Sequence, residues 1–171
     1  STTPSSVFQA EALARGDCDV AFTAFDNVVA YTEGQGAAAI DGDPGFRVLM
    51  GATQLRLSLV VAPEIESYED LRGRSLALDA LATGFAFVLY EMLARAGLGP
   101  DDCALAAVGA TPQRWQSVKS GTHAGTLTIE PFTSIARRDG FRVLDDSGRL
   151  FDSYQGGIVA ARLEWARANR P

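Results

Sequence analysis

Short apolar segments alternate with helix-forming segments along most of this chain, and this alternation constrains the fold more than any other feature. The apolar segment 75–79, for example, precedes a helical segment in which Phe85, Leu89 and Met92 recur at the helical interval. Strands that alternate with helices are joined by right-handed crossovers and pair mainly in parallel. The sequence therefore predicts an α/β fold with mainly parallel sheets.

The complete pattern predicts seven helical and eight strand segments. The predicted helices are 6–15, 26–33, 67–71, 83–96, 111–120, 131–138 and 163–168. The predicted strands are 19–22, 47–52, 54–62, 75–79, 104–108, 125–129, 141–144 and 158–161.

The alternation is interrupted once, because two strands follow each other directly between residues 47 and 62. This is how a chain leaves one α/β lobe and enters another, and a second change of lobe is expected near residue 154. We therefore expect an incomplete first lobe of residues 1–53 with 154–171 and a second lobe of residues 64–153. Residues 54–63 form the crossover strand between them.

The composition excludes several classes of protein. The 15 basic and 21 acidic residues give a net charge of −6, and Lys119 is the only lysine, so binding to nucleic acid is not expected. No apolar run reaches the roughly 20 residues that span a bilayer. Apolar residues make up 47% of the chain, which is enough for a folded core.

Neither a metal site nor a catalytic pair is indicated. Cys18 and Cys103 have no neighbour at metal-ligand spacing, and we expect them in different lobes, without a disulfide between them. The only histidine, His123, precedes a predicted strand, where a surface role is favoured over a catalytic one. The sequence therefore predicts no catalytic residue, no metal and no cofactor.

Four segments resemble the type 2 periplasmic substrate-binding proteins of ABC transporters, the class that includes nitrate, alkanesulfonate, taurine and thiamine-precursor binders. They are ALARGDCDVA (residues 12–21), DLRGRSLAL (70–78), the helix end with its linker (89–102), and the helix, strand and Glu-Pro segment at 113–131. Each motif is weak by itself, whereas the ordered set covers most of the chain and is moderately specific.

The resemblance implies two small α/β lobes joined by a hinge of two crossovers, with a solute bound in the cleft between them. It implies a small-molecule ligand, a membrane permease as partner, and a periplasmic or extracytoplasmic location, although no signal peptide is present. Chains of this family are usually nearly twice as long and begin with a strand that is missing here. We therefore also expect that a homo-oligomer could complete the first lobe.

In open α/β sheets, ligands bind beyond the carboxyl ends of the strands. Residues at four such places are candidates for ligand binding. They are Thr23, Phe25, Asp26 and Asn27 after the first strand; Asp79, Thr83, Gly84 and Phe85 after the first strand of the second lobe; Glu130 after a later strand; and Thr53, Arg56 and Tyr154 at the crossovers.

Each candidate also has a purely structural interpretation. Thr83 and Gly84 can present free N–H groups to an anion, or Thr83 can simply cap its helix. Phe25 can stack on a flat ligand or belong to the core, and Asp26 is more simply a helix cap. Arg56 can bind a carboxylate or sulfonate, but a salt bridge at the hinge is the simpler role.

Two acidic candidates leave the sign of the ligand charge open. Asp79 and Glu130 end apolar strands, so each must be solvated or paired, either at a cleft wall or in a surface turn. These carboxylates favour a cationic ligand, whereas Arg56 and the start of the helix at Thr83 favour an anionic one.

Three functions are compatible with this pattern. The first is a binding protein that delivers a small polar organic molecule to its permease. The second is an enzyme on the same scaffold, of the decarboxylase or cofactor-precursor synthase type and then cytoplasmic, in which Asp26, Asp79 or Glu130 acts as acid or base. The third is a remnant or regulatory domain with an empty cleft. We favour the binding protein.

Overall fold

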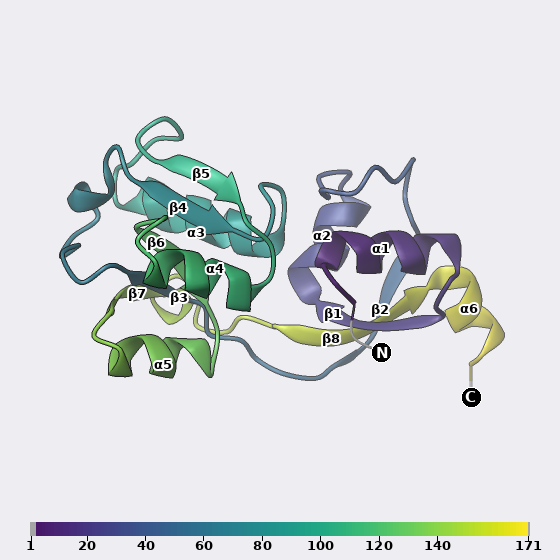
Figure 1. Ribbon diagram of the computed structural model, residues 1–171. Coiled ribbons are helices and arrows are strands. Elements are labelled where there is room, and N and C mark those ends of the chain that lie inside the picture. The colour runs from purple at the N-terminus through teal and green to yellow at the C-terminus, as the bar shows by residue number, and fades with distance from the viewer. Residues whose placement is uncertain (1–2, 171) are drawn as a thin grey trace. The chain divides into compact units, whose positions relative to one another are not determined.

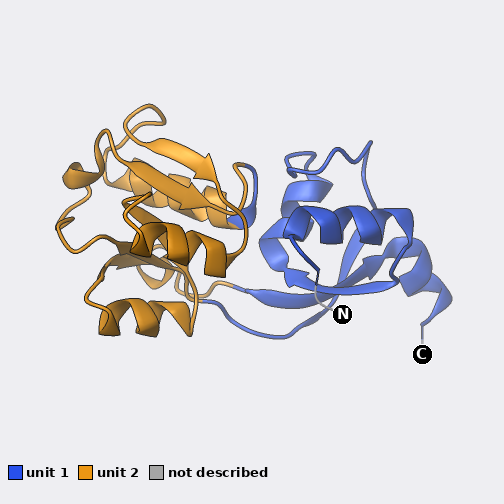
Figure 2. Ribbon diagram, in the orientation of Figure 1, with its two compact units in different colours: residues 1–55, 82–84, 155–171 blue, residues 56–81, 85–154 orange. Residues whose placement is uncertain are grey.

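The computed structural model describes residues 3–170, which fold into two compact α/β units (Figure 2). In the described chain, unit 1 contains residues 3–55, 82–84 and 155–170, and unit 2 contains residues 56–81 and 85–154. Residues 82–84, which the sequence assigned to the second lobe, therefore cluster with unit 1. The α/β fold class is confirmed in both units.

Unit 1 is a three-stranded sheet with helices, ordered β1-β8-β2 (Figure 1). Its elements are α1 (Ser6–Arg15), β1 (Val20–Ala24), α2 (Phe25–Thr32), β2 (Phe46–Gly51), β8 (Gly157–Arg162) and α6 (Leu163–Ala168). β8 is antiparallel to both neighbours, so β1 and β2 run in the same direction. β8, the strand on which the chain returns to unit 1, is thus the one strand of this sheet that runs in the opposite direction.

One face of this sheet carries the core of unit 1. Leu13 of α1 and Val28 and Tyr31 of α2 pack with Phe46 and Ile158 of the sheet. Burying these apolar side chains is the main source of stability for so small a unit.

The caps of these helices differ in part from the sequence expectation. α1 ends at Gly16 in the left-handed conformation, φ 82°, as predicted. Its N-cap is Ser5, whose hydroxyl accepts a hydrogen bond from the Phe8 N–H at 3.1 Å, so the helix begins at Ser6 as the predicted range 6–15 has it. α2 begins after Ala24 without a side-chain cap, so the prediction that Asp26 caps this helix is wrong.

The opposite face of the same sheet is apolar and exposed. Phe22 and Met50 are both opposite Val159 in the strand register, so the three side chains form one row across the sheet. Phe22 is 60% and Met50 is 58% exposed, and Val20 is exposed on the same strand as Phe22. An apolar face of this kind normally packs against a further layer.

Unit 2 is a five-stranded sheet, ordered β5-β4-β6-β3-β7 (Figure 1). Its elements are β3 (Ser58–Val61), the 3₁₀ turn η1 (Glu69–Leu71), β4 (Ser75–Leu78), α3 (Gly84–Arg95), β5 (Ala104–Ala107), α4 (Thr111–Lys119), β6 (Gly125–Thr128), α5 (Phe132–Arg138), β7 (Arg142–Asp146) and the 3₁₀ turn η2 (Ser147–Arg149). β4 pairs in parallel with β5 and β6, whereas β3 is antiparallel to β6 and β7.

The predicted parallel pairing therefore holds among β4, β5 and β6, whereas β3, on which the chain enters the unit, is antiparallel to both of its neighbours, β6 and β7. α4 packs on β4 and β6, and α5 packs on β3 and β7. Trp115 and Val118 of α4 are buried against Val60, and the Trp115 ring meets Phe141 edge-on at 4.8 Å between centroids. Trp115 is thus a packing residue, as its helical position suggested.

The predicted long strand 54–62 is wrong in its first half. Strand pairing begins only at Ser58, and Gln54 makes an isolated bridge with Gln155. At Leu57 the backbone instead bonds to Ser147, donating to the hydroxyl at 3.0 Å and accepting from the N–H at 2.8 Å. The alternating leucines gave the correct extended backbone, but this stretch has no sheet to join until it reaches β6 and β7.

Candidate ligand-binding site

The carboxyl ends of three parallel strands meet at one edge of the unit 2 sheet. β4 ends before Asp79, β5 ends before the Val108–Gly109 turn, and β6 ends before Ile129. Helices α3 and α4 begin a few residues after the first two of these strands. Polar groups from separate parts of the sequence therefore converge here, as expected for the ligand-binding edge of an open α/β sheet.

A buried arginine lies at the centre of this edge. Arg114 of α4 is only 2% exposed. Its Nη1 donates to the Gly109 carbonyl at 2.7 Å, its Nη2 to Thr111 Oγ1 at 3.1 Å and to the Leu127 carbonyl at 3.2 Å, and its Nε to Thr126 Oγ1 at 3.2 Å. All four acceptors are uncharged oxygens, so these bonds hold the guanidinium in place without neutralising it.

Two neighbours modulate this charge. The Arg114 guanidinium carbon lies 5.4 Å from the centre of the Phe85 ring, a cation–π contact. Burial lowers the pKa of Arg114 from its ordinary value, and the negative charge of Asp79 acts in the opposite direction. Because arginine remains protonated even when buried, the edge keeps a fixed positive charge.

Buried threonine hydroxyls surround the arginine. Thr126 and Thr128 are both fully buried on β6, where Thr126 Oγ1 donates to the Ala77 carbonyl at 2.8 Å. Thr128 Oγ1 lies 2.8 Å from Thr133 Oγ1. Both hydroxyls are thus engaged within the protein, and Thr126 Oγ1 also accepts from Arg114 Nε, so they fix the polar groups of this edge in place.

At the beginning of α3, two of the predicted site residues, Gly84 and Asp26, lie close together within unit 1. Thr83 and Gly84 are buried. A Cβ built on Gly84 would lie 1.7 Å from the Asp26 carboxyl carbon, so only glycine lets this carboxyl group approach the backbone so closely. Asp26 also accepts a hydrogen bond from the Asn27 N–H at 2.8 Å.

The other candidates after β1 occupy the first turn of α2. The Asn27 amide donates to Thr23 Oγ1 at 3.4 Å. Phe25 is 39% exposed, and its N–H donates to the Gly156 carbonyl at 2.8 Å. Phe25 is therefore not a core residue, contrary to the structural interpretation that the sequence favoured slightly.

The crossover candidates make local structural contacts. The Thr53 hydroxyl accepts from the Gly157 N–H at 3.0 Å, within unit 1. Arg56 is 73% exposed and lies 3.9 Å from Asp146, which is the salt bridge considered the simpler role. The Tyr154 ring stacks on Phe151 at 5.6 Å between centroids.

Glu130 likewise serves a helix. Its side chain is exposed, and its Oε2 accepts a hydrogen bond from the Ser134 N–H at 3.2 Å, in the first turn of α5. This contact of Glu130 thus fits the surface-turn alternative better than the cleft wall. Asp79, in contrast, is half-buried and close enough to raise the pKa of Tyr90, after burial as the larger cause.

Arg114 and the threonines of β6 were missed by the sequence analysis, although signals for both exist. Arg114 lies one helical turn before the buried Val118 and therefore faces the sheet. Thr126 and Thr128 alternate around Leu127, which places both hydroxyls on one face of the strand. A charged residue on the sheet-facing stripe of a helix is the pattern to look for.

Within residues 3–170, no group of three or more His, Cys, Asp or Glu side chains is placed to hold a metal ion. Cys18 and Cys103 are both free thiols. None of the described helices combines the length and apolarity needed to cross a membrane.

The chain has the fold of the periplasmic binding proteins, which confirms the resemblance at the level of the fold. The alkanesulfonate-binding protein SsuA from Xanthomonas axonopodis pv. citri, solved with MOPS, aligns over 97% of this chain and 55% of its own, with TM-score 0.75 and 19% identity. The aliphatic sulphonate-binding SsuA from Escherichia coli aligns over 98% and 55%, with TM-score 0.73 and 22% identity.

The periplasmic nitrate-binding protein NrtA from Synechocystis PCC 6803 is also similar, with TM-score 0.79 and 14% identity over 97% of this chain and 47% of its own. The chain thus spans about half the length of the solved structures it matches. By sequence, it matches no protein-family profile and no curated protein.

Proposed function

We propose that this chain binds a small organic anion reversibly and belongs to an extracytoplasmic ABC-type uptake system, in which it delivers the solute to a membrane permease. The observation that carries the proposal is the buried guanidinium of Arg114, which lies at the carboxyl edge of β4, β5 and β6 and donates its four hydrogen bonds to uncharged oxygens. In a partly buried setting, a unit charge about 6 Å away contributes about 3 kcal/mol at an effective dielectric of 20.

Similar folds support the same chemistry. Three solved proteins with this fold are described as binding sulfonates or nitrate, all of which are anions. Thr126 Oγ1 donates its proton to the Ala77 carbonyl and accepts from Arg114 Nε, so this hydroxyl positions the guanidinium for an anion. The exposed Glu130 accepts a hydrogen bond in the first turn of α5. Of the acidic candidates, Asp79 is the one whose negative charge acts on Arg114.

We further propose that the solute is held in a cleft between the two units and that binding draws them together. In unit 1, the candidates Phe25, Asp26 and Asn27 follow β1 in the same way as Asp79 follows β4 in unit 2, and Thr23 lies near the end of β1 itself. Small-angle scattering tests this part separately. A radius of gyration that decreases on ligand addition supports closure, and an unchanged radius with saturated binding contradicts it.

Isothermal titration calorimetry with methanesulfonate, acetate, nitrate and choline tests the proposed charge of the ligand. We expect heat of binding from at least one anion and none from choline. Arg114→Gln should weaken that binding about 10- to 100-fold, the equivalent of about 1.4 to 2.8 kcal/mol. The matched control is Arg137→Gln, which removes an equal charge from an exposed position of the same unit.

Binding of choline but of no anion would contradict the proposal. A measured turnover of a bound carboxylate would favour the enzyme alternative. If Arg114→Gln fails to fold, Phe85→Ala removes the cation–π contact while the guanidinium keeps its four hydrogen bonds, and it should weaken anion binding more than Phe151→Ala does.

A further inference from the structure

The outer edge of the unit 2 sheet carries unpaired backbone groups. β5 pairs with β4 only, and it is the last strand on its side of the sheet. The N–H groups of Ala104 and Val108 donate towards β4, to the Arg74 and Leu78 carbonyls at 2.8 and 2.7 Å. Because successive amides of a strand point to opposite sides, the N–H groups of Leu105 and Ala107 point away from the sheet.

No described residue accepts a hydrogen bond from either of these two N–H groups. The edge also lacks the usual protection. Its sequence is Ala-Leu-Ala-Ala-Val, without lysine or proline, and Ala104 and Ala107 are exposed. Such an edge can pair with a further extended backbone.

An apolar pocket adjoins this edge. It has a volume of about 390 Å³ and is lined by α3, by the loop that follows α3, and by β5. The buried side chains of Leu93, Leu98 and Cys103 line it, together with Leu105 of β5 itself. The pocket is therefore on the side of β5 to which Leu105 points, and alternate side chains of an added strand would point the same way.

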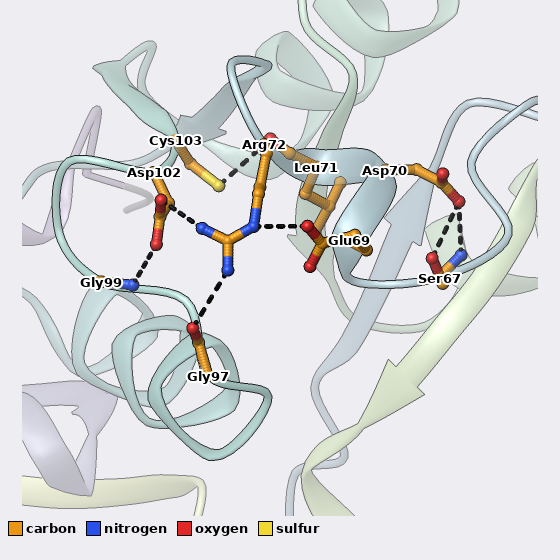
Figure 3. A network of polar contacts seen from close by, with 9 residues as sticks. All are labelled: Ser67, Glu69, Asp70, Leu71, Arg72, Gly97, Gly99, Asp102 and Cys103. Carbon is orange, nitrogen blue, oxygen red and sulfur yellow. Dashed lines mark hydrogen bonds and ion pairs between the residues drawn. The ribbon is translucent and has the colours of Figure 1, made fainter.

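The wall of the pocket is held in place by a polar network (Figure 3). Arg72 pairs with Asp102 and with Glu69, and it also donates to the Gly97 carbonyl at 3.3 Å. Asp102 in turn accepts from the Gly99 N–H at 2.6 Å. The loop between α3 and β5 is thus tied at both ends, so the pocket is formed before any ligand arrives, which lowers the entropic cost of binding.

We propose that β5 and this pocket form a binding site for an extended peptide, which adds a sixth strand to the unit 2 sheet and places an apolar side chain in the pocket. Main-chain hydrogen bonds to Leu105 and Ala107 would supply affinity, and the pocket would supply selectivity. This inference does not rest on the proposed solute site, because none of the residues that accept a hydrogen bond from Arg114 lines the pocket.

The charge of the chain indicates which peptide fits. Asp101 is exposed at the start of the edge, and the chain carries a net charge of −6. A peptide with a basic residue beside an alternating apolar stretch is complementary to this surface. A second copy of the acidic chain is less favoured, because like charges would meet.

The test uses a fluorescent, capped hexapeptide, Lys-Val-Thr-Val-Thr-Val, and two versions of it that are N-methylated at alternate amides. Fluorescence anisotropy should show binding of the parent and of one methylated version only, since only one set of amides faces β5. Amide exchange should show that Leu105 and Ala107 become protected on binding. Binding of both methylated versions, or of none of the three peptides, would overturn the proposal.

Two substitutions separate the edge from the pocket. Ala107→Pro removes an outward N–H that the sheet does not use, and it should weaken binding at least tenfold. Ala94→Trp fills the mouth of the pocket and should weaken binding similarly, whereas the control Ala96→Trp changes an exposed residue outside the pocket. Equal affinities for the two tryptophan variants would overturn the pocket assignment.

The other possible occupants give different results. Protection of Leu105 and Ala107 that rises with protein concentration, in the absence of peptide, would show that a second copy occupies the edge and would overturn the proposal. A pocket that binds toluene, in protein that binds no peptide, would also overturn it in favour of a small apolar ligand.

Discussion

Replacing Arg114 by methionine tests whether this residue is held in place as described. Methionine is unbranched, uncharged and shorter than arginine, so Arg114→Met removes the guanidinium and its four hydrogen bonds but keeps an apolar side chain on the sheet-facing side of α4. At about 0.5–1.5 kcal/mol net for each bond, the loss is about 2–6 kcal/mol. Removing a buried charge recovers part of this, because the desolvation cost disappears, so we expect unit 2 to lose about 2–4 kcal/mol.

Urea unfolding followed by tryptophan fluorescence measures this loss. Trp115 is buried in unit 2, and the other tryptophan, Trp165, belongs to unit 1. In a Trp165→Phe background, the fluorescence therefore reports on unit 2 alone. The control is Arg137→Met, an exposed position that should change stability by less than about 0.5 kcal/mol.

A result for Arg114→Met within about 0.5 kcal/mol of the Arg137→Met value would refute this reasoning. It would mean that the free energy gained from the four hydrogen bonds of the guanidinium only offsets the desolvation cost of burying its charge. A variant more stable than the parent would make Arg114 a pure cost to the fold, and its retention would then need a functional explanation.

Three further predictions concern stability, pH and association. Gly125→Ala should destabilise unit 2 by at least about 2 kcal/mol in urea unfolding, because the new Cβ would lie 2.9 Å from the Val60 carbonyl oxygen in the middle of the sheet. The Gly99 N–H, and after it Arg72, hold the pKa of Asp102 below its ordinary value. The contribution of ionised Asp102 to the stability of the fold is therefore present above about pH 4 and is lost as the pH falls through the folded-state pKa. Asp102→Asn should flatten this part of a profile of melting temperature against pH. The exposed row of Phe22 and Met50 should cause self-association, seen as a mass above 18.1 kDa in light scattering, and Phe22→Glu should reduce it.

Each of these predictions has a matched control. Gly99→Ala should be tolerated, because its new Cβ would meet only the Asp102 carboxylate at 3.6 Å. Asp101→Asn removes the charge of an exposed neighbour and should leave this part of the melting-temperature profile unchanged. Val29→Glu adds a charge to another exposed apolar position of unit 1, on α2 rather than on the sheet. Equal effects of a variant and its control would contradict the corresponding reasoning.

Much of the fold could be predicted because it depends on local patterns. Helix α3 was predicted to within a residue at each end, since its apolar stripe and the glycine at 97 are both local signals. The strand expected at 54–62 shows the limit of this approach. An alternating segment predicts an extended backbone, but whether it pairs depends on which strands lie beside it, and β6 and β7 come about 70 residues later.

The candidate site was harder to predict for the same reason. Rules for strand ends selected Asp79 and Phe85, and the structure places both close to the buried guanidinium of Arg114. Arg114 itself was overlooked, because its acceptors lie on two separate segments, 109–111 and 126–127, that only the fold brings together. Asp26 was expected to cap a helix, whereas its contact with Gly84 joins residues 58 positions apart and has no local signature.

The central claim is that an anion binds at the strand edge that contains Arg114. The most direct test is to follow the side-chain Nε–H signal of Arg114 by nitrogen-15 NMR while methanesulfonate is added, with choline as the cationic counterpart. The account predicts a saturable shift of this signal with the anion and none with choline. A signal that moves with choline, or stays constant while methanesulfonate saturates a different part of the protein, would contradict it.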